Sequence, residues 1–184
     1  MSNPNPAMRS KLMNLPNKLT ILRILLIPVC IMLIALKWHF PAAVVFAVAS
    51  ITDFLDGYLA RRDNLVTNFG KFADPVADKL LVLTAMVMLT SQGMLPAWAV
   101  CILIIRELSV DGLRMVAAGK KNVVAASIWG KMKTTLQIIC VLSALLHMPG
   151  WITMVMTVLM TIATVFSGAD YFIKLKDVFK EDVE

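Results

Sequence analysis

Charged residues are scarce in this chain. They make up 16% of its 184 residues, whereas a soluble globular domain usually carries roughly 25%. Hydrophobic residues account for 59% and gather in long runs. The composition therefore argues against an ordinary soluble domain and predicts an all-α integral membrane protein. At roughly 20 apolar residues per crossing, the chain can form about six transmembrane helices with a short N-terminal juxtamembrane segment.

Cysteine and histidine are also few. Cys30, Cys101 and Cys140 stand singly in apolar runs, without the pair spacing or the nearby histidine that a zinc site needs. We interpret them as free, buried thiols. The first apolar run, ILLIPVCIMLIAL, is not followed by a small-residue cleavage site, so we expect it to stay as the first span.

Proline, glycine and charge clusters divide the chain into predicted spans and connections. We place the spans at about 17–37, 41–61, 72–91, 96–117, 129–147 and 151–172. They form one six-helix domain, 17–172, between a cytoplasmic juxtamembrane segment, 1–16, and a cytoplasmic tail, 173–184.

Lys and Arg are distributed unevenly among the connections. KWHF, SQGMLP and HMPG hold one cation, Lys37, while the termini and the connections 62–71 and 118–128 hold many. The positive-inside rule therefore puts both termini and these two connections in the cytoplasm. The net charge of +6 is scattered between spans instead of lining one polar face, so we do not expect nucleic-acid binding.

Four aspartates interrupt this apolar pattern within 26 residues: Asp53, Asp56, Asp74 and Asp78. Helical spacings of three and four put each pair on one face of its own helix. The short connection 62–71 makes the two helices antiparallel neighbours, so the four carboxylates can converge. An acid near the bilayer centre costs about 2.5–3.5 kcal/mol, and the group therefore needs to be neutralised.

Two explanations of this neutralisation are open. The acids could pair with Arg61, Arg62 and Lys79, or lie in the headgroup layer. Alternatively they could bind divalent metal. An all-oxygen ligand set favours Mg²⁺ or Mn²⁺ over zinc, and four carboxylates suffice for two ions.

Small residues lie beside the acids. Gly57, Ala60 and Gly70 remove side chains from the backbone around them, either for close helix packing or to leave room for a ligand.

The stretch resembles a known family. Asp53-x-x-Asp56-Gly57-x-x-Ala60-Arg61, eight residues, then Gly70-x-x-x-Asp74-x-x-x-Asp78 reproduces every fixed position in the signature of the CDP-alcohol phosphotransferases. LPNKLTILRILLIP, ADPVADKLL, IIRELSVDGLR and GKMKT are similar to segments of bacterial phosphatidylglycerophosphate synthases, and the resemblance runs from about residue 15 to 172. It implies transfer of a phosphatidyl group from CDP-diacylglycerol to an alcohol, with CMP leaving.

The resemblance also implies roles for single residues. Asp53, Asp56 and Asp74 would be metal ligands, and Asp78, close to the metals, would be the base that removes the alcohol's proton or a plain fourth ligand. The residues expected to bind CDP-diacylglycerol are Asn17, Thr20, Asp56, Gly57, Ala60, Arg61 and Gly70. The resemblance also leads us to expect a homodimer that contacts membrane lipids. We expect it to be a multi-pass protein of the bacterial cytoplasmic (inner) membrane, with its active site facing the cytoplasm.

Four cations are our candidates for binding the acceptor alcohol: Arg106, Arg114, Lys131 and Lys133. Each could instead form a salt bridge with a nearby acid, Glu107 or Asp111, or snorkel to headgroups. Together they outnumber those two acids, which suggests a phosphate on the acceptor. sn-Glycerol 3-phosphate fits this requirement.

Other functions compete with this interpretation. Phosphatidylglycerol, as in cardiolipin synthases, or inositol phosphate could be the acceptor. A divalent-cation transporter would also use intramembrane carboxylates, but it needs polar residues at several depths. The runs VCIMLIAL, AMVML and CVLSALL carry no charge, so we do not expect a conduit.

Overall fold

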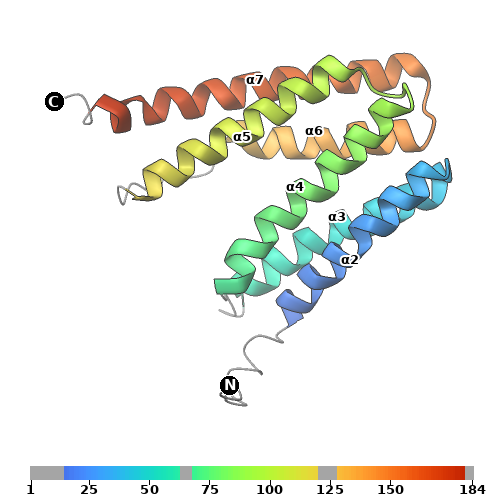
Figure 1. Ribbon diagram of the computed structural model, residues 1–184, viewed down its shortest axis with the longest axis horizontal. Coiled ribbons are helices and arrows are strands. Elements are labelled where there is room, and N and C mark those ends of the chain that lie inside the picture. The colour runs from blue at the N-terminus through green and yellow to red at the C-terminus, as the bar shows by residue number, and fades with distance from the viewer. Residues whose placement is uncertain (1–14, 63–67, 120–127, 181–184) are drawn as a thin grey trace. The chain divides into compact units, whose positions relative to one another are not determined.

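A computed structural model describes residues 15–62, 68–119 and 128–180, and it describes side chains at 17–53, 73–117 and 128–174. These residues form six helices and no strand (Figure 1): α2 (Leu15–Ala35), α3 (His39–Arg62), α4 (Asn68–Ser91), α5 (Ala97–Gly119), α6 (Ile128–Leu145) and α7 (Gly150–Lys180). The prediction of an all-α chain is confirmed for this part of the molecule. The prediction of buried thiols is confirmed for Cys30 and Cys140 but is wrong for Cys101, which is exposed because it shares a face of α5 with the exposed Ile105 and Leu108.

The helices match the predicted spans to within a few residues at most ends. Two ends differ: α4 begins at Asn68, inside the predicted connection 62–71, and α7 continues to Lys180, beyond the predicted end at 172. By length and hydropathy, two stretches of the described residues could cross a membrane, Asn17–Ala35 and Gly150–Lys174. Membrane crossing by the other four helices stays a prediction.

The chain divides into two compact units, Met1–Met88 and Leu89–Glu184, here called the N-terminal and C-terminal units. In the N-terminal unit, α2 packs against α3. α3 contributes mainly small side chains to this unit's core, Ala42, Ala43 and Ala49, with Phe46 among them, all buried. Small residues let helix backbones approach closely, which is how membrane helices gain packing energy where lipid supplies no hydrophobic drive.

In the C-terminal unit, α7 packs against both α5 and α6. A stripe of buried polar side chains runs along α7. The hydroxyls of Thr157 and Thr161 each donate to the backbone carbonyl four residues earlier, at 2.8 Å, and Thr164 does the same at 2.7 Å. Because the helix satisfies these hydroxyls itself, they can be buried away from water. The stripe consists of Thr153, Thr157, Thr161, Thr164 and Ser167.

Three helix ends share one geometry. Lys37, Gly93 and His147, just after α2, α4 and α6, have positive φ angles of 60°, 72° and 51°. At each end, the amides of this residue and of the next one donate to carbonyls in the last helical turn, at 2.9 to 3.0 Å. This is the Schellman arrangement, which satisfies terminal carbonyls and reverses the chain within a few residues.

Candidate functional site

The first candidate site, in the N-terminal unit, is built on α2. Asn17, Thr20 and Arg23 are three residues apart, so they share one face of the helix, and each has an exposed fraction of 2% or less. Farther along α2 this face continues with Ile27, Cys30 and Ile34, which are also buried. A polar patch therefore occupies the start of an otherwise apolar packing face.

Two residues of this patch contact aspartates of the predicted site. Thr20 Oγ1 donates a hydrogen bond to Asp74 Oδ1 at 2.5 Å, and Arg23 Nη1 forms an ion pair with Asp53 Oδ1, also at 2.5 Å. Thr20 and Arg23 are about 4.5 Å apart along the helix axis. The first aspartate of α3 and the first of α4 thus approach the same turn of α2.

The remaining residues of the predicted site are placed in part. Asp78 follows Asp74 by one turn of α4 and is partly exposed, and the Asp53 side chain keeps 34% of its exposure. These carboxylates are therefore accessible, although α2 holds two of the acids. The following site side chains fall outside those that the structure describes: Asp56, Gly57, Ala60, Arg61 and Gly70.

The predicted metal site can be compared with these donors. Among the described side chains, no group of three or more histidine, cysteine, aspartate or glutamate residues is arranged to hold a metal ion. The side chain of Asp56, the remaining acid of the predicted site, lies outside the described side chains. The donors that lie here are carboxylate and hydroxyl oxygens, which suit Mg²⁺ or Mn²⁺ and not zinc. The chemistry of the donors fits a hard cation, and the metal site stays a prediction.

A second candidate site lies in the C-terminal unit, around Glu107 of α5. This carboxylate is 4% exposed and pairs with Arg106 Nη1 at 3.2 Å and with Lys133 Nζ of α6. Salt bridging to Glu107, one of the alternatives open from the sequence, is thus found for two of the four cations. In these two ion pairs, two cations share one carboxylate.

Side chains of α7 contact the two arginines of α5, Arg106 and Arg114. Arg106 Nη2 donates to Ser167 Oγ at 2.5 Å, and its guanidinium lies 5.6 Å from the centre of the Tyr171 ring. The guanidinium of Arg114 lies 4.7 Å from the centre of the same ring and donates to the Tyr171 hydroxyl. We call Arg106, Glu107, Arg114, Lys133, Ser167 and Tyr171 the cation cluster.

The structure thus brings together three of the four predicted acceptor residues. Lys131 is exposed on α6, and among the described side chains it makes no ion pair with the cation cluster. Sequence reasoning did not assign roles to Arg23, Ser167 or Tyr171. For Arg23 a signal existed, because a single arginine stands inside the apolar run ILRILLIP, three residues after Thr20.

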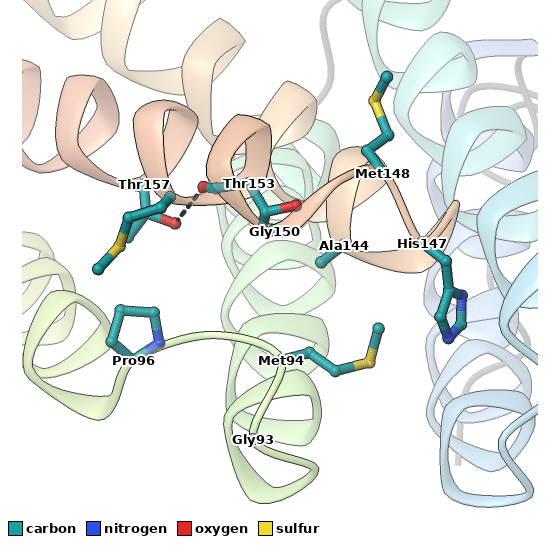
Figure 2. A pocket seen from close by; sticks show the side chains of 10 residues that line it. Gly93, Met94, Pro96, Ala144, His147, Met148, Gly150, Thr153 and Thr157 are labelled. Carbon is teal, nitrogen blue, oxygen red and sulfur yellow. Dashed lines mark hydrogen bonds between the residues drawn. The ribbon is translucent and has the colours of Figure 1, made fainter.

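A cavity lies elsewhere in the C-terminal unit (Figure 2). It has a volume of about 400 Å³ and is lined by the connections after α4 and after α6, with Met94, His147 and Met148 among their residues, and by the first turns of α7. In the figure, the Met94 side chain extends toward His147, whereas Met148 points away from it. None of the predicted site residues lines this cavity.

Comparison with known proteins adds to this geometry. Residues 13–166 match the sequence profile of the family described as CDP-alcohol phosphatidyltransferase. A Bacillus subtilis protein named CDP-diacylglycerol–glycerol-3-phosphate 3-phosphatidyltransferase is 50% identical over 149 residues, which cover 73% of this chain and 77% of that protein. A Shigella flexneri protein of the same name is 42% identical over 84% of this chain and 88% of its own. A Mycobacterium tuberculosis protein named probable phosphatidylglycerophosphate synthase is 38% identical, covering 92% and 86%.

Proposed function

Because the chain belongs to the CDP-alcohol phosphatidyltransferase family, we propose that it transfers a phosphatidyl group from CDP-diacylglycerol to sn-glycerol 3-phosphate. The products are phosphatidylglycerophosphate and CMP. The names of its relatives in Bacillus and Shigella describe this reaction. The apolar helices α2 and α7 keep the chain in the membrane where the lipid donor resides, and we place the site at the cytoplasmic face of the bacterial inner membrane, in a homodimer.

The N-terminal unit would handle the donor. In this proposal Asp53, Asp56, Asp74 and Asp78 hold one or two Mg²⁺ or Mn²⁺ ions, which when bound offset the negative charge of the pyrophosphate. Arg23 and Thr20 orient Asp53 and Asp74 through the contacts described above. The groups that we assign to the rest of the CDP moiety are Asn17, Thr20, Gly57, Ala60, Arg61 and Gly70.

Asp78 is our candidate for the base. It removes the proton from the acceptor hydroxyl, whose oxygen forms a bond to the phosphorus of the phosphatidyl group. The bond from that phosphorus to the bridging oxygen of the pyrophosphate breaks, and CMP leaves with the electron pair. The partial exposure of Asp78, one turn from Asp74, supports this role because a base must reach a substrate that enters from solution.

The choice of acceptor is carried by one observation, the charge of the cation cluster. Arg106 and Lys133 pair with the carboxylate of Glu107, and Arg114, which shares the Tyr171 ring with Arg106, has no carboxylate partner among the described side chains. An arginine held by a neutral ring and a hydroxyl keeps its charge available for an anion. The phosphate of sn-glycerol 3-phosphate would supply that anion, with Arg and Lys donating charge-assisted hydrogen bonds.

The experiment is a comparison of acceptors. Purified protein in detergent micelles is given CDP-diacylglycerol and Mg²⁺ with sn-glycerol 3-phosphate, phosphatidylglycerol, inositol phosphate or serine, and CMP release is measured. We expect release with sn-glycerol 3-phosphate and a loss of that release in excess EDTA. Release with another acceptor and none with sn-glycerol 3-phosphate would overturn the proposed acceptor, and full activity in EDTA would overturn the proposed metal.

A further inference from the structure

Tyr171 of α7 occupies an unusual position for an aromatic residue in an apolar helix. It is 1% exposed and belongs to a cluster of buried residues with Val110, Leu113 and Ala117 of α5. Its ring also lies under two guanidiniums, those of Arg106 and Arg114. One neutral side chain therefore contacts two of the three cations of the cation cluster.

The contact with Arg114 is the more complete of the two. This guanidinium lies 4.7 Å from the ring centre and also donates to the phenol oxygen of Tyr171. Among the side chains that the structure describes, Arg114 has no carboxylate partner. A ring and a hydroxyl fix the direction of a guanidinium without cancelling its charge.

Three neighbouring residues of α7 hold Arg106 in place. Ser167 accepts its hydrogen bond, Tyr171 lies beneath it, and Gly168 leaves the space that its side chain fills. A Cβ at position 168 would lie only 3.2 Å from Arg106 Cγ. α7 thus offers a complementary surface to this arginine, again without a charged group.

We propose that Tyr171 is a positioning residue for the phosphate of the acceptor. It holds Arg114 and Arg106 in fixed orientations. Arg106 shares its charge with Glu107, whereas the charge of Arg114 is left for the substrate, since a carboxylate in place of Tyr171 would neutralise it. This inference rests on the proposed function, in which the cation cluster binds sn-glycerol 3-phosphate. It concerns affinity for the acceptor only, because the donor is assigned to the N-terminal unit.

Steady-state kinetics of the full-length enzyme in detergent micelles test this inference. Tyr171→Phe keeps the ring and its volume but removes the oxygen that accepts from Arg114, and Tyr171→Leu removes the ring as well. We expect KM for sn-glycerol 3-phosphate to rise about threefold in the first variant and about tenfold or more in the second. KM for CDP-diacylglycerol should stay within about twofold of wild type. Phe172→Leu, a neighbouring aromatic that is 52% exposed, is the matched control and should change neither constant.

Two results would overturn the inference. One is an unchanged KM for sn-glycerol 3-phosphate in Tyr171→Phe and in whatever Tyr171→Leu protein folds, and the other is an equal rise in both KM values. Arg114→Gln, measured in parallel, separates this failure from that of the proposed function. If Arg114→Gln raises KM for sn-glycerol 3-phosphate and the Tyr171 variants do not, only the role of Tyr171 is wrong. If the wild-type enzyme does not use sn-glycerol 3-phosphate, the proposed function is wrong.

Discussion

A single buried arginine organises the candidate site of the N-terminal unit. Arg23 is fully buried in α2 and pairs with Asp53, which is itself one third exposed. Burying a guanidinium costs several kcal/mol unless a partner compensates it. Arg23 therefore neutralises part of the acidic charge, and it is a partner that neither explanation open from the sequence included, divalent metal or pairing with Arg61, Arg62 and Lys79.

This pair predicts energetic coupling. Arg23→Gln should lower the free energy of unfolding by about 1–3 kcal/mol, because Asp53 loses its cation but keeps access to solvent. Asp53→Asn should also destabilise the protein, because it leaves the arginine buried without its acid. The double variant should lose about 0.5–3 kcal/mol less stability than the sum of the losses in the two single variants. Thermal unfolding in detergent measures this cycle, and strictly additive losses would show that the ion pair contributes nothing.

The contacts around the arginines and aspartates are the part that the sequence did not predict. Thr20 and Asp74 are 54 residues apart, Arg114 and Tyr171 are 57 apart, and Arg106 and Ser167 are 61 apart. Helical spacing tells which residues share a face of one helix, but not which face of another helix that face will meet. Tyr171 therefore carried no signal in the sequence, whereas the aspartates did, because their spacing is a property of single helices.

At the scale of elements, helix positions were largely predictable. Apolar runs of sufficient length, ended by Gly, Pro or charged residues, located all six helices. The end of α7 was missed because hydropathy falls where the lysines begin near Lys174, while the backbone hydrogen bonds of the helix continue to Lys180. Hydropathy indicates where lipid ends, and the helix itself does not have to end there.

The glycine at the end of α4 provides a prediction at this scale. Gly93 has a φ of 72°, and nothing lies within 4 Å of a Cβ placed on it, so substitution there meets backbone strain alone. Gly93→Ala should destabilise the protein by about 1 kcal/mol. Gly112, inside α5, also has open space around it but has helical geometry, and Gly112→Ala should stabilise by about 0.5–1 kcal/mol. Unfolding midpoints of the two variants that move in the same direction would contradict this assignment.

At the scale of the whole molecule, the distribution of cations predicts the orientation in the membrane. In a background in which the native cysteines are replaced, including the exposed Cys101, single cysteines at Asn64 and Asn122 should react with a membrane-impermeant reagent only from the cytoplasmic side. A cysteine at Gln92 should react only from the opposite side. Labelling in inverted and right-side-out vesicles distinguishes the two, and external labelling at Asn64 would put the carboxylates on the wrong face for a cytosolic acceptor.

The two units have different tasks in this account: the carboxylates of the N-terminal unit serve the donor, and the cation cluster of the C-terminal unit selects the acceptor. Arg114 is the cleanest probe of the second task, because its contacts among the described residues are with the neutral Tyr171. Lys174, a lysine of α7 that is 48% exposed and paired with Asp170, is a matched control outside the cluster.

The most direct measurement is kcat/KM of Arg114→Gln for each substrate, beside Lys174→Gln and the wild-type enzyme. Loss of a charge-assisted hydrogen bond of about 1.5–3 kcal/mol predicts a roughly 10- to 150-fold fall in kcat/KM for sn-glycerol 3-phosphate. KM for CDP-diacylglycerol should move by less than about twofold, and Lys174→Gln should behave as wild type. An equal loss toward donor and acceptor in Arg114→Gln, or no loss toward either, would contradict the assignment of the cation cluster to the acceptor phosphate.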